Sequence, residues 1–191
     1  YSLLEGALTI SKIVDHAVAS GAPAVGIADT NNLFGALEFA QKASKAGVQP
    51  IIGCQVSVDF GDGGQGGVPA RRHDAPLPSI LLIAATGTGY TNLVRLVSRA
   101  YMDSPPGDTV HVPADWLSDL SDGIIVLTGG PSGPVDELVG PAHDAAVVRL
   151  ARLKSAFGDR LYIELQRPQG YGKAHEAAMI ALAYGENLPL V

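Results

Sequence analysis

The stretch AVGIADTNNLFGALEFAQKASKAGVQPIIGCQVSV, residues 24–58, predicts one strand–helix–strand unit from which the rest of the chain can be interpreted. An apolar run at residues 24–28 is typical of a strand covered on both faces. From Leu33, apolar residues recur at helical spacing as far as Gly47, a residue type that commonly ends helices. A second apolar run begins at Pro50. The pattern therefore indicates two strands joined by a helical crossover.

Four polar residues, Asp29, Thr30, Asn31 and Asn32, follow the first of these strands. In parallel α/β folds, functional sites lie at this carboxyl edge of the sheet. The same residue types also cap helices, because their side chains accept hydrogen bonds from the first N–H groups of a helix. A lone carboxylate in such a turn is more often a cap than a metal ligand, so we expect Asp29 and its neighbours to cap the helix that starts at Leu33.

Strand and helix patterns alternate through the rest of the chain. Helices are predicted at about residues 10–20, 90–101, 116–120, 142–157 and 172–184, and strands at about residues 51–60, 79–84, 124–128, 161–165 and 188–191. On the second of these helices, one stripe is expected to contain Tyr90, Leu93, Val94, Val97 and Tyr101. We expect a right-handed crossover at each step and a sheet that curves into a barrel surrounded by helices. The 191 residues suit one domain, spanning 1–191, with one sizeable core.

Composition excludes several classes of protein. The net charge of −6, with 13 Lys and Arg, argues against independent binding of nucleic acid, because duplex binding needs a concentrated basic surface. The longest apolar runs are shorter than the roughly 18 residues of a membrane span, and no secretory signal opens the chain. The single cysteine, Cys54, excludes an internal disulfide and fits a reducing cytoplasmic setting. Within its apolar strand, Cys54 is expected to be buried and unreactive.

Two glycine-rich segments predict loops. Residues 61–78, GDGGQGGVPARRHDAPLP, show no apolar periodicity and predict a flexible surface loop without a core. Their RRHD cluster at residues 71–74 could contact a partner or a phosphate, although composition favours a solvated loop. Residues 129–133, GGPSG, could cradle an anion, but they lack the Lys-Ser/Thr ending of a phosphate-binding loop. A tight turn from strand to helix is the expected structure there.

Several motifs, taken together and in order, resemble one known family. They are YSLLEGAL (residues 1–8), DTNNLFGALEF (29–39), QPIIGCQ (49–55), GYTNLVRLVS (89–98), GIIVLTGG (123–130) and YIELQR (162–167). Over its whole length the chain resembles the PHP domain (polymerase and histidinol phosphatase domain) of bacterial DNA polymerase III alpha subunits. The resemblance implies a PHP-type distorted (β/α)7 barrel, here truncated at both ends. It places a strand with a His-x-His pair before Tyr1 and an Asn-Asp-x-His segment after Val191.

In active members of this family, metal ions at the strand ends hydrolyse phosphoesters. The positions that correspond to this site are Asp29, Thr30, Asn32, Gln55, Gly130 and Pro168, with Ser79 as a less secure match. Thr30 and Pro168 stand where the family has histidines, and Gln55 stands where it has a glutamate. Because a metal centre needs several imidazole and carboxylate ligands around each ion, we expect a degenerate site with no catalytic residue and no bound metal.

The five histidines, His16, His73, His111, His143 and His175, show no metal-ligand spacing and are expected at the surface. Cys54 has no histidine nearby in sequence, and Ser132 does not lie in a Gly-x-Ser-x-Gly motif. A nucleophilic hydrolase therefore has no support from the sequence.

By resemblance, this segment belongs to a DNA-directed DNA polymerase, a nucleotidyltransferase of DNA replication, but lacks the polymerase active site. Magnesium is expected for the parent polymerase and no cofactor for this segment. The expected partners are the other domains of the alpha subunit and the separate proofreading exonuclease subunit, with DNA bound only through the whole polymerase, no membrane, and a cytoplasmic location. Two alternatives stay open: an active metal-dependent PHP phosphoesterase, which bound zinc or manganese would favour, and a free-standing binding module.

Overall fold

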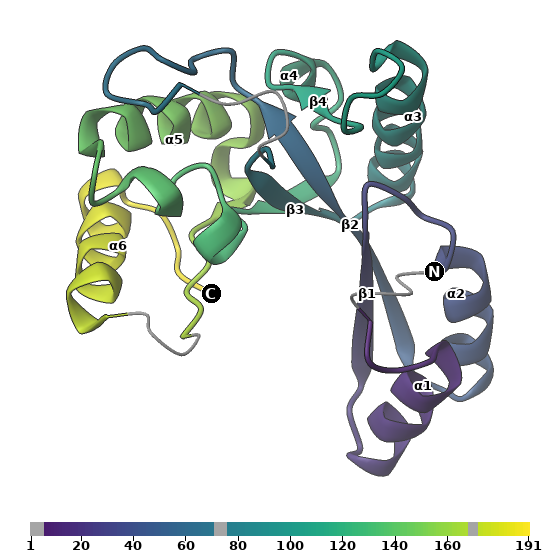
Figure 1. The fold of residues 1–191 in the computed structure, drawn as a ribbon. Helices are drawn as coiled ribbons and strands as arrows, with labels where there is room; N and C mark the ends of the chain where they lie inside the picture. The colour runs from purple at the N-terminus through teal and green to yellow at the C-terminus, as the bar shows by residue number, and fades with distance from the viewer. Residues whose placement is uncertain (1–5, 71–75, 168–171) are drawn as a thin grey trace.

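The computed structural model describes residues 6–70, 76–167 and 172–191, and Figure 1 shows how their helices and strands are arranged. The helices are α1 (Ile10–Ala19), α2 (Ala36–Lys45), α3 (Gly87–Asp103), α4 (Trp116–Asp119), α5 (His143–Phe157) and α6 (Lys173–Glu186). The strands are β1 (Ala24–Thr30), β2 (Gln49–Asp59), β3 (Ser79–Ala84), β4 (Val112–Pro113), β5 (Ile124–Leu127) and β6 (Leu161–Tyr162). Short 3-10 turns occupy η1 (Gly130–Ser132), η2 (Asp136–Leu138) and η3 (Gly158–Arg160). Within the described ranges, no helix is long and apolar enough to span a membrane.

The strands form one mixed sheet in the order β1-β2-β3-β5-β6, and β4 pairs with the far end of β2. β1 is parallel to β2 and β5 is parallel to β6, whereas β3 runs antiparallel to both of its neighbours. The expectation of a crossover at every step is therefore wrong. Antiparallel neighbours need no helical crossover, and the described parts of the connection from β2 to β3 contain no helix.

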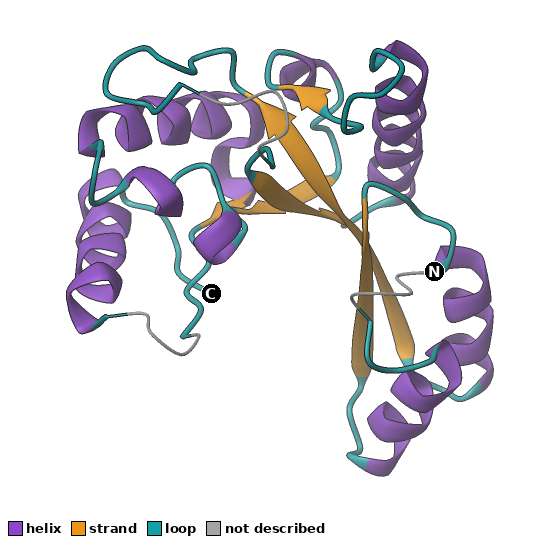
Figure 2. Cartoon of the chain, viewed as in Figure 1, coloured by secondary structure: helices purple, strands orange, loops and turns teal. Residues whose placement is uncertain are grey.

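β1 and the first half of β2 project from the rest of the sheet, with α1 and α2 lying against them (Figure 2). We call α1, β1 and α2 the N-terminal lobe. Its small core consists of Val14, Phe39 and Ala43, packed against Ile10, Ile13, Val25, Ile27 and Ile52. The predicted cap of α1 is confirmed, since the Thr9 hydroxyl accepts a hydrogen bond from the Lys12 N–H at 3.4 Å. The lobe thus has an apolar core of its own.

The larger core joins the sheet to α3, α4, α5 and α6 and includes fully buried leucines and isoleucines from β3, α3, β5 and α5. On α3 the buried side chains include Asn92, Leu93, Leu96 and Ala100. Leu93 and Val97 of the predicted stripe are buried, whereas Tyr90, Val94 and Tyr101 are 40%, 38% and 49% exposed. These three exposed residues lie along the flank of the buried face rather than at its centre.

The segment after β2 is anchored to α5 through a buried arginine. Arg149 is 2% exposed, and its guanidinium donates two 2.7 Å hydrogen bonds to the Asp62 carboxylate and one of 2.7 Å to Glu137. Val68 is buried in the larger core. These contacts correct the expectation that residues 61–78 contribute nothing to a core. Residues 71–74, the basic cluster, lie outside the described residues, and the flexibility of the loop stays a prediction.

Candidate functional site

The expected site positions meet where β1 ends beside β2 and β3. The parallel register pairs Asp29 with Cys54 and Thr30 with Gln55, and the antiparallel register of β2 and β3 pairs Ser57 with Ser79. Because side chains alternate between the faces of a strand, Thr30, Gln55, Ser57 and Ser79 form one polar row on the same face of the sheet. The sequence therefore predicted correctly that Thr30, Gln55 and Ser79 lie close together.

Within this row the neutral groups bind one another. The Gln55 amide Nε2 donates a hydrogen bond of 2.7 Å to the Ser79 hydroxyl. Ser79 is buried and Gln55 is half-buried, so this hydrogen bond is largely shielded from solvent. In shielded surroundings, a polar pair of this kind satisfies groups that would be costly to leave unpaired.

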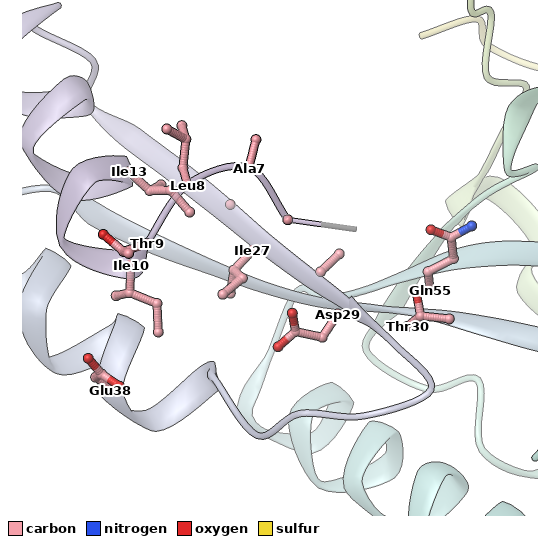
Figure 3. A pocket seen from close by; sticks show the side chains of 13 residues that line it. Ala7, Leu8, Thr9, Ile10, Ile13, Ile27, Asp29, Thr30, Glu38 and Gln55 are labelled. Carbon is pink, nitrogen blue, oxygen red and sulfur yellow. The ribbon is translucent and has the colours of Figure 1, made fainter. Parts of the chain in front are cut away.

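Asp29 lies on the other face of β1, the side that α1 and α2 cover. Figure 3 shows its carboxylate turned away from the Gln55 amide, in a hollow lined also by Ile27, the start of α1 and Glu38. Asp29 is 8% exposed, and its Oδ2 lies against Gly35, where an added Cβ would be 3.0 Å away. The Asp29 carboxylate and the Thr30 side chain thus lie on opposite faces of β1, although Asp29, Thr30 and Gln55 all line this hollow.

The helix that Asp29 and its neighbours were expected to cap starts later than predicted. α2 begins at Ala36 rather than Leu33, and its N-cap residue is Gly35, which has no side chain that could act as a cap. Asn32 instead forms a local turn, in which its amide donates to the Thr30 carbonyl at 2.9 Å and accepts from the Phe34 N–H at 3.1 Å. The Asp29 carboxylate nevertheless lies beside Gly35 at the start of α2, and its contribution to this helix start stays a prediction.

Asn31 was not among the expected site residues, although it makes the most contacts between segments in this turn. Its φ is 54°, in the left-handed region that Gly and Asn adopt more readily than other residues. Its side chain accepts a hydrogen bond from the Ser57 N–H at 2.9 Å and donates to the Ser57 hydroxyl and the Val110 carbonyl, each at 3.1 Å. Residues 29–32 correspond to an Asp-His-Gly-Asn pattern of the family that the sequence resembles, and Asn31 stands at its glycine. This polar replacement was the available signal in the sequence.

Gly130 lies at the end of β5, near but not within the polar row. The preceding Gly129 packs against the Ser79 carbonyl, where a Cβ would overlap the oxygen. Gly130 has a φ of 57° and faces the side chain of Gln166. Residues 130–132 form the tight turn that the sequence predicts. Pro168 lies outside the described residues.

Cys54 confirms the expectation of a buried, unreactive thiol. It is fully buried within β2, and burial raises the pKa of its thiol to about 12. Hydrogen bonding to the Asn32 backbone opposes this shift, whereas the nearby Asp29 carboxylate adds to it. Because only the thiolate is an effective nucleophile, Cys54 has a structural role at neutral pH.

The residues present do not fit a metal cluster. In the described parts of the chain, no group of three or more His, Cys, Asp or Glu residues is placed to hold a metal ion. The polar row offers a Thr hydroxyl, a Gln amide and Ser hydroxyls, which are weak ligands compared with imidazole and carboxylate. Asp29 supplies a carboxylate, but from the other face of β1.

Two of the described histidines, His111 and His175, are half-buried rather than at the surface as expected. His175 in α6 is half-buried, and its Nε2 lies 2.7 Å from Oδ1 of Asp136, which is 2% exposed. Burial raises the pKa of the Asp136 carboxyl, and the hydrogen bond with His175 only partly opposes this shift. His16 and His143 are exposed, His111 is half-buried, and His73 lies outside the described residues. The 39-residue separation of Asp136 and His175 leaves no local signal for this pair.

Comparisons with known proteins show which family the chain belongs to. The PHP domain family matches residues 1–168, and the chain belongs to that family. Within it, the chain is 43% identical over 196 residues to the DNA polymerase III subunit alpha of Caulobacter vibrioides, and 32% identical over 198 residues to that of Escherichia coli K12. Each match covers 100% of this chain and 16% of the relative, so the chain spans about one sixth of the length of these relatives.

Two solved structures show a similar fold. One is a candidate metal-dependent phosphoesterase from Bifidobacterium adolescentis, with a TM-score of 0.51 and 14% identity, covering 97% of this chain and 81% of its own. The other is an amidohydrolase from Chromobacterium violaceum with bound sulfate and no metal, with a TM-score of 0.57 and 13% identity, covering 100% and 82%. At these identities the likeness concerns the fold alone. The predicted fold class, a PHP-type α/β barrel, is confirmed.

Proposed function

We propose that this chain is the PHP domain of a replicative DNA polymerase alpha subunit and that its own metal-dependent site is degenerate. In this role it braces the polymerase and does not hydrolyse phosphoesters. The observation that carries the proposal is the 2.7 Å hydrogen bond between Gln55 Nε2 and Ser79 Oγ. It engages, in a neutral pair, two positions at which the resemblance places metal-binding groups.

The chemistry of this pair opposes metal binding. A metal ion needs anionic or imidazole ligands that leave water and converge on it, and each neutral replacement lowers the affinity. The Gln55 N–H group points at Ser79, so this end of the amide presents a proton rather than a lone pair. Neutral hydroxyl and amide groups also need no counter-charge when they are shielded from water. The polar row is therefore stable without an ion.

The partners of the domain follow from its relatives. Because the relatives are alpha subunits about six times longer than this chain, the first partners are the other domains of the same subunit. A docking surface for the separate proofreading exonuclease is part of the proposal, as is a cytoplasmic location. DNA would be bound through the whole polymerase, since the net charge of −6 disfavours independent binding of a phosphate backbone. Magnesium would serve the polymerase site outside these residues.

An assay of phosphoester hydrolysis tests the catalytic part of the proposal. The purified protein is expected to hydrolyse an activated phosphoester no faster than a buffer control, with manganese or zinc added or absent. A Thr30→His, Gln55→Glu variant restores two ligand types and is also expected to be inactive, because the other expected ligands remain absent from the described residues. Metal-dependent hydrolysis by the unmutated protein would contradict the proposal. It would identify the chain as an active metal-dependent phosphoesterase, the alternative function.

Direct binding tests the docking part separately. The purified protein and the purified exonuclease subunit of the same organism are mixed and separated by gel filtration. Co-elution is expected at micromolar concentrations. Two separate peaks at these concentrations would contradict exonuclease docking while leaving the degenerate site untouched.

A further inference from the structure

The N-terminal lobe and the rest of the molecule have separate apolar cores, and β2 runs through both. The lobe core contains Val14, Phe39 and Ala43, whereas Cys54 and Val56, farther along β2, belong to the larger core. β3 begins to pair with β2 only at Gly53, so the preceding part of β2 pairs with β1 alone. A two-stranded ribbon of this kind is a weak connection by itself, because it takes three or more strands or further packing to make a sheet stable.

Asn31 adds a second connection at the place where the ribbon meets the larger sheet. Its amide nitrogen bonds the Val110 carbonyl, 79 residues away in the sequence, at 3.1 Å. The same side chain bonds both the N–H and the hydroxyl of Ser57, and its backbone N–H donates to the Gln55 carbonyl at 2.7 Å. One residue therefore ties the end of β1 to β2 and to the segment before β4.

The backbone of Asn31 suits this role. A φ of 54° turns the chain sharply after β1 and directs the side chain back towards β2. Glycine would make the turn but would offer no side chain, and most other residues would strain it. Asn combines tolerance of the left-handed region with one acceptor and two donors. The three side-chain bonds use all of these groups.

We propose that Asn31 is a latch that fixes the orientation of the N-terminal lobe against the rest of the domain. Leu33, two residues on, packs against the larger core and acts with it. Since Asp29 and Thr30 precede the latch directly, the latch also sets where the strand-end turn lies. This role needs no metal and is independent of the proposed link to a polymerase.

The orientation of the lobe can be measured by pulsed electron resonance between two spin labels. One label is attached through Lys45→Cys on α2 and the other through Met102→Cys on α3, both at exposed positions. Cys54 stays unlabelled because it is fully buried and its thiol pKa is raised to about 12. The parent protein is expected to give one narrow distribution of distances. Asn31→Gly keeps the backbone turn, removes the three side-chain bonds, and is expected to broaden or shift the distribution.

Two further variants separate a latch from general destabilisation. Asn92→Ala removes another buried Asn, whose amide bonds the Asp122 carbonyl within the larger unit, and is expected to leave the distribution narrow. Asn31→Asp keeps the acceptor for the Ser57 N–H but loses both donors, so it is expected to broaden the distribution as well. It serves as the test if Asn31→Gly does not fold.

Amide exchange provides the local readout. In Asn31→Gly the Ser57 amide is expected to exchange about fivefold faster, the change that corresponds to about 1 kcal/mol for one hydrogen bond at 1.4 kcal/mol per tenfold. In Asn31→Asp the Ser57 amide is expected to keep its protection. Unchanged distance distributions in both Asn31 variants would overturn the proposal, and so would equal broadening in Asn92→Ala.

Discussion

At the scale of single residues, the Asp62–Arg149 pair is the most consequential contact outside the candidate site. Arg149 is buried, and removing Asp62 leaves it with the Glu137 carboxylate and the Pro134 carbonyl as partners. We expect Asp62→Ala to lower the free energy of unfolding by about 2–3 kcal/mol, less than for a wholly unpaired buried charge because Glu137 remains. Chemical denaturation measures the free energy of unfolding of the variant and of the unmutated protein. The control is Asp115→Ala, which removes an exposed ion pair with Arg152 and should cost less than about 1 kcal/mol. Equal losses in the two variants would contradict the importance of the buried pair.

The same pair predicts a dependence on pH. The hydrogen bond from Arg149 lowers the pKa of the Asp62 carboxyl below its ordinary value of 3.8. A carboxyl whose pKa is lowered by folding stabilises the folded state above its unfolded pKa, and this contribution disappears as the pH falls through the folded pKa. The stability difference between Asp62→Ala and the parent should therefore be constant near neutral pH and shrink below about pH 4. Denaturant titrations across this range provide the measurement, and a difference that grows towards acid pH would contradict it.

Gly130 is a second residue whose type is dictated by its surroundings. Its φ is 57°, and an added Cβ would lie 2.7 Å from the Gln166 side chain. Gln166 can move, but the backbone strain remains, so Gly130→Ala is expected to lower stability by about 1–2 kcal/mol. Gly87→Ala is the matched control, because no atom lies within 4 Å of the added Cβ and the φ is not positive. Thermal melts of the two variants give the comparison, and similar melting temperatures would show that the turn relaxes freely.

At the scale of elements, helix starts differ in how they are capped. The Thr86 hydroxyl accepts a hydrogen bond from the Gly89 N–H at 3.0 Å at the start of α3, whereas α2 starts at Gly35 without a side-chain cap. We expect Thr86→Ala to lower the free energy of unfolding by about 1 kcal/mol. Thr88→Ala, on the exposed first turn of α3, should change it by less than about 0.5 kcal/mol. Indistinguishable melting curves for the two variants would contradict the cap.

Much of the element pattern could be predicted because it depends on local sequence. β3 was expected at residues 79–84 and occupies Ser79–Ala84, since a short apolar run between turns has few other interpretations. Its direction could not be predicted, because an apolar run has the same pattern whichever way the strand runs. The stripe predicted on α3 contained the buried Leu93 and Val97 but also the exposed Tyr90 and Val94, because residues at the centre and at the flank of a buried face both recur at helical spacing.

The candidate site was predictable only in part. Thr30, Gln55 and Ser79 lie near one another because β1 ends beside the middle of β2 and β3 begins there in the antiparallel direction. Asp29 was expected to cap a helix starting at Leu33, but α2 starts only at Ala36, because the chain first passes through the turn that Asn32 forms with Thr30 and Phe34. Pairings between distant residues, such as Asp62 with Arg149 or Asp136 with His175, leave no mark on local patterns.

At the scale of the whole molecule, the chain combines the fold of a metal-dependent hydrolase with a neutral strand-end site. The alpha-subunit relatives extend far beyond it, so a domain of this kind is one part of a larger polypeptide in those proteins. Buried apolar side chains and the hydrogen bonds of the polar row hold these parts of the strands together.

The metal content of the purified protein decides between a degenerate and a working site. Elemental analysis after incubation with zinc and manganese, followed by gel filtration, should find neither metal in a stoichiometric amount. The physical reason is that Thr30 and Gln55 supply neutral groups where imidazole and carboxylate are needed. One or more tightly held ions per chain, lost when Asp29 and Gln55 are replaced by Ala, would contradict the degenerate site.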